Sequence, residues 1–284
     1  MSDRFPIAAI TDEFASDFES ALESMASVGM NGAELRMLWD KNVIDLSDEE
    51  LDRAIELARC HGMQIISIAS PLLKCVLPHA PPVDERFQQD SFASKHTFAD
   101  QLRLTARAFE IAERAGARII RVFSYWRTVE PETCFRRIVD ALGELADQAA
   151  SRGVTIGLEN EHACNIGTGA ETGRLLAALE HPNLRVVWDP ANASVAGERP
   201  MEGYRKLPAA RIAHVHAKDC TVEDHKPTWL ELGTGSIPWT EQIGALAKDG
   251  YSGWISLETH WPGPGGDKQA GSVICGRNLK NLVA

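Results

Sequence analysis

The chain has 284 residues, 44% of them hydrophobic, and is long enough to bury one large core. Its 40 acidic residues outnumber its 29 lysines and arginines, and the net charge of −11, with no basic block, disfavours nucleic-acid binding. No apolar run approaches the about 20 residues of a membrane span. The six cysteines form no C-x-x-C pair, so we expect reduced thiols and a cytoplasmic protein that binds neither nucleic acid nor a membrane.

Short apolar runs alternate with helical patterns along the chain. They predict strands at 6–11, 32–36, 63–69, 118–124, 154–159, 184–189, 211–217 and 253–258. Their continuous apolar character is typical of parallel strands that are covered on both faces. Eight such strands separated by helices predict a closed (β/α)8 TIM barrel rather than a doubly wound sheet, and we expect a single α/β domain over residues 1–284.

The segments between these strands carry helix start signals and two long interruptions. Ser47-x-x-Glu50 and Thr168-x-x-Glu171 are capping-box patterns that precede apolar stripes. Residues 71–95 and 219–238 break the alternation. Both follow the C-terminal end of a predicted strand, where barrel enzymes build the loops that cover their substrates, so we expect both to border the functional site.

In the second half of the chain, four predicted strands each end in a side chain that can bind a metal. These residues are Glu159, Asp189, His216 and Glu258. Each has an ordinary interpretation alone, as a helix-start acid, a turn former, a core histidine or a surface carboxylate. Because the strands of a barrel converge on one mouth, however, the four charges would repel one another without a cation. The set predicts one divalent ion, Mn²⁺ first, with Mg²⁺ and Co²⁺ as alternatives.

Further polar residues are predicted to line the same mouth. His214 and His216 share one face of a strand, and we favour His216 as the ligand because it is nearer the C-terminal end. Glu34 and Arg36 end the second strand, where they either bind substrate hydroxyls or form an ion pair with each other.

Two more residues are expected to contact a substrate. His162 follows the first predicted ligand along the chain, and Lys218 follows the histidine ligand; Lys218 has Asp189 or Asp219 as an alternative partner. Several tryptophans, Trp188 and Trp229 among them, fall near predicted mouth loops. We expect one or two of them to form an aromatic wall.

Several motifs along the chain resemble those of the sugar phosphate isomerase/epimerase superfamily of xylose isomerase-like TIM barrels, with its tagatose 3-epimerase and inosose dehydratase branches. The matching stretches are Gly32-Ala33-Glu34-Leu35-Arg36, Gly157-Leu158-Glu159-Asn160, Val187-Trp188-Asp189-Pro190-Ala191-Asn192, His214-Val215-His216-Ala217-Lys218-Asp219, Gly233-Thr234-Gly235-Ser236-Ile237 and Leu257-Glu258. The resemblance implies that Glu159, Asp189, His216 and Glu258 hold the ion and that the two glutamates also act as the acid/base pair.

The resemblance is less specific about the reaction. Epimerases of the superfamily usually have a histidine where this chain has Asn192, which we count among the substrate-binding candidates. The Lys218-Asp219 pair is more similar to inosose dehydratases. Endonuclease IV shares the barrel but uses a larger set of histidines and glutamates for three metals, and the acidic charge of this chain argues against DNA repair.

These observations predict a metal-dependent isomerase or epimerase that acts on a small keto-sugar or polyol ketone. One glutamate would remove a proton beside the carbonyl and the other would return it, while the ion stabilises the enediolate. If the β-hydroxyl leaves instead, the enzyme is a keto-cyclitol or keto-sugar dehydratase (a lyase). A carbohydrate-binding barrel without chemistry would not need the acid/base pair. The expected partner is a small-molecule carbohydrate, and a homo-oligomer is compatible with the sequence.

Overall fold

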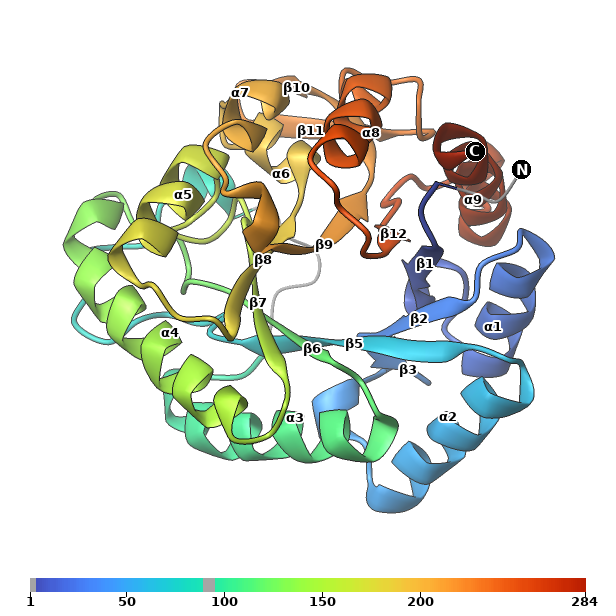
Figure 1. Ribbon diagram of the computed structural model, residues 1–284, viewed down its shortest axis with the longest axis horizontal. Helices are drawn as coiled ribbons and strands as arrows, with labels where there is room; N and C mark the ends of the chain where they lie inside the picture. The colour runs from blue at the N-terminus through green and yellow to red at the C-terminus, as the bar shows by residue number, and fades with distance from the viewer. Residues whose placement is uncertain (1–3, 89–94) are drawn as a thin grey trace.

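The computed structural model describes residues 4–88 and 95–284. Parallel strands close into a barrel in the order β1-β12-β9-β8-β7-β6-β5-β2, with the helices outside it (Figure 1). The strands are β1 (Ile7–Ile10), β2 (Gly32–Leu35), β5 (Gln64–Leu72), β6 (Ile119–Val122), β7 (Thr155–Glu159), β8 (Leu184–Trp188), β9 (Ile212–Ala217) and β12 (Ile255–Leu257). Each predicted strand overlaps one of these, and the predicted eight-stranded α/β barrel is confirmed.

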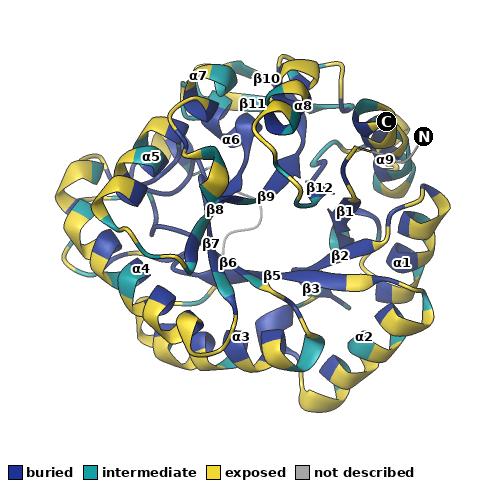
Figure 2. Cartoon of the chain, in the orientation of Figure 1, coloured by how far each residue is buried: buried dark blue, intermediate teal, exposed yellow. Residues whose placement is uncertain are grey.

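The helices cover the barrel and bury the side that faces it, as Figure 2 shows. They are α1 (Phe18–Ser27), α2 (Asp48–Cys60), α3 (Gln101–Ala115), α4 (Phe135–Ala150), α5 (Gly169–Ala178), α6 (Pro190–Val195), α7 (Pro200–Tyr204), α8 (Trp239–Lys248) and α9 (Lys268–Val283). Short 3-10 helices are η1 (Thr11–Glu13), η2 (Val43–Asp45), η3 (Glu85–Phe87), η4 (Phe98–Asp100), η5 (Pro131–Cys134), η6 (Ala209–Arg211) and η7 (Pro264–Gly266). Both predicted capping boxes form, at Ser47 before α2 and at Thr168 before α5.

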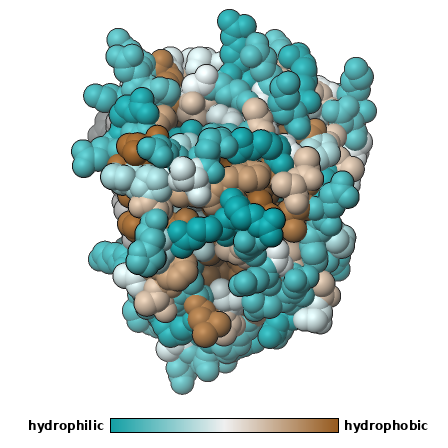
Figure 3. Space-filling model, turned by 90° about the vertical axis from the view of Figure 1, so that its left-hand side faces the viewer, coloured by the Kyte–Doolittle hydropathy of each residue, from teal (hydrophilic) through white to brown (hydrophobic). Residues whose placement is uncertain are grey.

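The outer surface is mostly polar on the face that can be seen in Figure 3, as expected when the apolar sides of the helices face the barrel. The face on the side of α4 and α5 is mostly hydrophilic, and its hydrophobic side chains lie in small separate groups (Figure 3). In the described ranges, no helix is both long enough and apolar enough to cross a membrane.

The segment 219–238 forms a small hairpin beside the C-terminal end of β9. Strand β10 (Asp219–Glu223) pairs antiparallel with β11 (Lys226–Leu230), and Cys220 lies opposite Trp229. The buried carboxylate of Asp219 accepts hydrogen bonds from the backbone N–H of Cys220 and from three backbone N–H groups in the loop after β11, those of Gly233, Gly235 and Ile237. This carboxylate therefore holds the loop against the end of the barrel.

The other two irregular regions also lie at the C-terminal ends of strands. Strands β3 (Met37–Leu38) and β4 (Lys41–Asn42) form a hairpin after β2. The predicted interruption at 71–95 begins inside β5 and includes η3 and an isolated bridge between Val83 and Thr128. Residues 89–94 of this segment lie outside the described part of the chain.

Candidate metal centre

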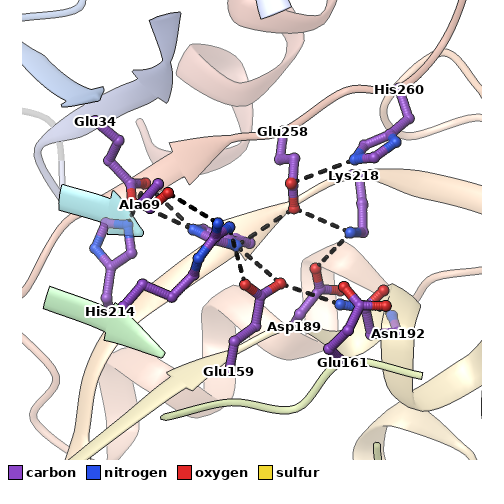
Figure 4. A network of polar contacts seen from close by, with 12 residues as sticks. Glu34, Ala69, Glu159, Glu161, Asp189, Asn192, His214, Lys218, Glu258 and His260 are labelled. Atoms are coloured by element: carbon purple, nitrogen blue, oxygen red, sulfur yellow. Dashed lines mark hydrogen bonds and ion pairs between the residues drawn. The ribbon is translucent and has the colours of Figure 1, made fainter. Parts of the chain in front are cut away.

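The four predicted metal ligands converge inside the mouth of the barrel. Figure 4 shows three of them, Glu159, Asp189 and Glu258, facing one another. Glu159 is the last residue of β7, Asp189 is the N-cap of α6 directly after β8, and Glu258 directly follows β12. His216 lies on β9, between β8 and β12. All four are buried, and one ligand atom from each lies within 4.8 Å of the others.

The inward face of β9 continues as a row of three basic side chains. His214, His216 and Lys218 are two residues apart and therefore point to the same side of the strand. At the top of this row, Lys218 Nζ lies 2.8 Å from Asp189 Oδ2 and 3.0 Å from Glu258 Oε2. Lys218 thus pairs with two of the predicted ligands, including Asp189, which was one of its expected partners.

Two arginines complete the charge balance, one directly after β2 and one on β6. Arg36 Nη1 lies 2.9 Å from Glu258 Oε1, and Arg121 Nη1 lies 3.1 Å from Glu159 Oε2. Together with Lys218, these contacts give each predicted carboxylate ligand a cationic neighbour. All three cations are buried. Because water is largely excluded, the electrostatic attraction within each ion pair is stronger than it would be at the surface.

Burial and the neighbouring charges shift the pKa values of two carboxyl groups in the cluster. Burial disfavours ionisation of Glu258, but Lys218 and His216 hold the pKa of that carboxyl well below its usual range. At Asp189 burial dominates and raises the pKa, although Lys218 opposes it. Glu159 Oε2 and Asp189 Oδ2 are buried, and each has a cation beside it, Arg121 at 3.1 Å and Lys218 at 2.8 Å. A buried donor set of three carboxylates and one imidazole fits a divalent cation, which the four residues would hold.

Glu34 lies below the cluster rather than in the mouth. Its Oε1 is 2.6 Å from His214 Nε2, and Oε1 and Oε2 are 3.3 and 3.4 Å from His216 Nε2. Burial opposes its negative charge, but the two histidines hold the pKa of Glu34 well below its usual range. Because the carboxylate is fully buried between two imidazoles, it faces the histidines and not the mouth.

Arg36 does not form the ion pair with Glu34 that was one interpretation of the sequence. Strand β2 ends at Leu35, and the Arg36 side chain extends across the mouth instead. Its Nη2 lies 2.8 Å from Asp12 and 2.6 Å from Glu13, and its Nη1 contacts Glu258. That interpretation was wrong because two carboxylates of η1 and the one that follows β12 lie within reach of Arg36 once the barrel closes.

Asn192 and His162, both predicted to contact substrate, form a chain behind the cluster. Asn192 donates its side-chain N–H to Glu159 Oε1 at 3.1 Å and its backbone N–H to Asp189 Oδ1 at 2.8 Å. His162 Nδ1 lies 3.0 Å from Asn192 Oδ1 and 3.0 Å from Glu161 Oε1. Asn192 is fully buried, and its contacts orient two predicted ligands.

A cavity of about 820 Å³ opens above Glu258. Its lining includes Arg36, Lys74, Arg121, Phe123, Glu258 and His260. Sequence reasoning missed Lys74 and Arg121. Arg121 could have been found from the sequence, because a charged residue within the apolar run of β6 is unusual. Lys74 lies in an irregular segment, where a lysine is common and gives no indication of function.

The two tryptophans singled out in the sequence have different environments. The centre of the Trp229 ring, on β11, lies 4.9 Å from the centre of the His260 ring. Lys218 Nζ lies 5.3 Å from the centre of the Trp229 ring. Trp188 points outward from β8 and donates its indole N–H to Gln242 Oε1 in α8 at 3.1 Å. Trp229 therefore borders the site, and Trp188 belongs to the packing between barrel and helices.

Proteins similar to this chain share its barrel. Inosose dehydratase 1 of Bacillus cereus is 23% identical over 278 residues, which cover 89% of this chain and 87% of that relative. A crystal structure of the IOLI protein with a zinc atom has a TM-score of 0.73 and 18% identity, covering 98% of both chains. The D-psicose 3-epimerase of Clostridium cellulolyticum, solved with D-tagatose, has a TM-score of 0.69 and 16% identity, covering 98% of this chain and 96% of that chain.

The two structural likenesses show the shared fold, and the matched proteins include a dehydratase and an epimerase by name. A family model described as xylose isomerase-like TIM barrel matches residues 22–274, most of the closed barrel. The chain therefore belongs to the xylose isomerase-like TIM barrel family.

Proposed function

We propose that this protein is a metal-dependent enzyme that removes a proton beside the carbonyl of a small polyhydroxy ketone, with dehydration as its overall reaction. The observation that carries the proposal is the convergence of Glu159, Asp189, His216 and Glu258 within 4.8 Å, where Glu258 lines a cavity large enough for a sugar or cyclitol. A divalent ion, Mn²⁺ in our first choice and Mg²⁺ or Co²⁺ otherwise, supplies Lewis-acid stabilisation of negative charge on substrate oxygen when bound.

Glu159 and Glu258 are the proposed proton carriers. They come from β7 and β12, with β8 and β9 between them in the barrel, so they approach the centre from different directions. One carboxylate takes the proton from the carbon beside the carbonyl, and the other lies on a different side of the centre. Arg121 and Arg36 hold the two carboxylates in place.

Lys218 supports dehydration in particular. Its ammonium group lies beside Asp189 and Glu258 and can donate a proton to a departing β-hydroxyl. The C–H and C–O bonds of the substrate then break, and an unsaturated ketone and water form. The similarity to inosose dehydratase over most of the chain supports the same reaction class.

Isomerisation or epimerisation is the second candidate function. It is favoured by the presence of two carboxylates at one centre, since one can remove a proton and the other can return it. The fold shared with D-psicose 3-epimerase is compatible with it. Against it, Asn192 occupies the position where the superfamily resemblance places a histidine, and an amide side chain does not ionise near neutral pH.

A substrate panel in deuterated water separates the two candidates. Purified protein would be loaded with Mn²⁺, Mg²⁺ or Co²⁺ and incubated with keto-cyclitols and ketohexoses. Dehydration predicts an unsaturated product with new ultraviolet absorbance, whereas epimerisation predicts a recovered sugar that carries solvent deuterium. A Glu159→Gln variant is the matched control for adventitious metal chemistry. If the loaded protein transforms no member of either substrate class, the proposed function is wrong.

A further inference from the structure

We infer that Glu34 is a positioning residue that fixes the His216 ring so that Nδ1 is the nitrogen presented to the metal. The inference rests on the proposed metal centre, but it concerns a residue that does not line the cavity. Glu34 is fully buried and lies among the side chains of β2 and β9.

The His216 ring has carboxylates on both sides. On one side Nε2 lies 3.3 Å from Glu34 Oε1, and on the other side Nδ1 lies 3.4 Å from Glu159 Oε1 and 3.3 Å from Glu258 Oε2. A neutral imidazole has one N–H group and one lone pair. Glu34 offers only acceptor oxygens, so it retains the N–H at Nε2 and directs the lone pair of Nδ1 toward the other carboxylates.

A lone pair that faces carboxylates is unfavourable unless a proton or a metal cation lies between them. The proposed ion meets this need because Nδ1 and the oxygens of Glu159, Asp189 and Glu258 can all bind it. A histidine ligand that donates its second ring N–H to a carboxylate is a recurrent arrangement in metal sites, where the carboxylate fixes both the tautomer and the ring orientation.

His214 in turn holds Glu34. Its Nε2 lies 2.6 Å from Glu34 Oε1, and its ring packs edge-on to that of His216, at 89° with 5.3 Å between the centres. Both histidines come from the inward face of β9, and Figure 4 shows Glu34 and His214 together on the side of the cluster away from Lys218. The carboxylate therefore has little freedom to turn away from His216.

Metal affinity tests the inference without relying on turnover. Isothermal titration with Mn²⁺ would compare chelator-treated wild type with Glu34→Gln, which keeps the size of the side chain but removes its charge. We expect binding to weaken by roughly 10- to 100-fold, as is typical when the carboxylate partner of a ligating histidine is lost. Glu171→Gln is the matched control, because Glu171 pairs with Arg127 and caps α5 away from the centre; its affinity should equal that of wild type.

The outcomes separate the two proposals. Wild type that binds no Mn²⁺ would show that the metal centre itself is wrong. Wild type that binds one ion together with Glu34→Gln that binds equally tightly would overturn the role of Glu34 alone. Two ions per wild-type chain would also overturn it, because Glu34, His214 and His216 would then form a metal site themselves.

A spectroscopic measurement on unmutated protein keeps the inference testable if Glu34→Gln does not fold. Protein labelled with ¹⁵N-histidine and loaded with Zn²⁺, which is diamagnetic, would be studied by long-range ¹H–¹⁵N correlation spectra. The His216 ring should carry its proton on Nε2 and show the shift of a metal-bound nitrogen at Nδ1. A His214→Gln sample identifies the neighbouring histidine signals. Zinc bound to Nε2 of His216 would contradict the inference.

Discussion

Replacement of Asp219 by alanine should destabilise the protein strongly although Asp219 is not a predicted ligand. Its carboxylate accepts N–H groups from Cys220 and Gly233, both at 2.9 Å, and from Gly235 and Ile237, both at 3.1 Å. Hydrogen bonds to a charged acceptor contribute roughly 1.5–3 kcal/mol each, but water replaces some of them after truncation. We therefore expect the free energy of unfolding to fall by about 3–5 kcal/mol.

For a chain of this size, about 1 kcal/mol corresponds to roughly 2–4 °C, so the melting temperature of Asp219→Ala should fall by roughly 6–20 °C. Circular dichroism melts and urea unfolding would measure the change. Asp219→Asn, which keeps one acceptor oxygen, should lose less. The hairpin also places Trp229 against His260. We therefore expect a higher KM than that of wild type in Asp219→Ala and in Asp219→Asn.

Asp147→Ala is the control for the loss of an aspartate. The side chain of Asp147 is 80% exposed on α4, and its removal should change stability by no more than about 0.5 kcal/mol. If Asp219→Ala melts within 2 °C of wild type, roughly the effect of 1 kcal/mol, the loop does not depend on this carboxylate and the reasoning is refuted.

Three further predictions concern the site. Glu159→Gln and Glu258→Gln should each lower kcat by about 10²- to 10⁴-fold with near-native circular dichroism, and full activity in either variant would remove its proposed role as proton carrier. Dialysis against a chelator should abolish turnover, and Mn²⁺, Mg²⁺ or Co²⁺ should restore it; a stripped enzyme that stays fully active would exclude the metal role. Burial opposes ionisation of Glu13, yet Arg36 lowers its pKa from 4.5 to about 2, so its contribution of roughly 3 kcal/mol is present above pH 4.5 and is lost as the pH falls toward 2. Urea unfolding across this range should show a shallower pH dependence in Glu13→Gln, and equal slopes would contradict the assignment.

The sequence was sufficient to predict the local elements and the order in which they form a barrel. Apolar runs and capping boxes are signals within a few neighbouring residues, because strand pleating and helix hydrogen bonds are local. The positions of Glu159, Asp189 and Glu258 followed from the same logic, since each lies at the end of a strand and parallel strands share one direction. The inward direction of His214 and His216 followed from the two-residue repeat of a strand.

Only the tertiary structure decided which charges meet. Arg36 and Glu258 are 222 residues apart, and nothing local in the sequence indicates their contact in preference to a pair between Arg36 and Glu34. The direction of a long side chain at the end of a strand depends on which acceptors barrel closure brings within reach. Closure likewise puts Glu34 beneath His216, because β2 and β9 lie on different sides of the ring and meet only through its interior.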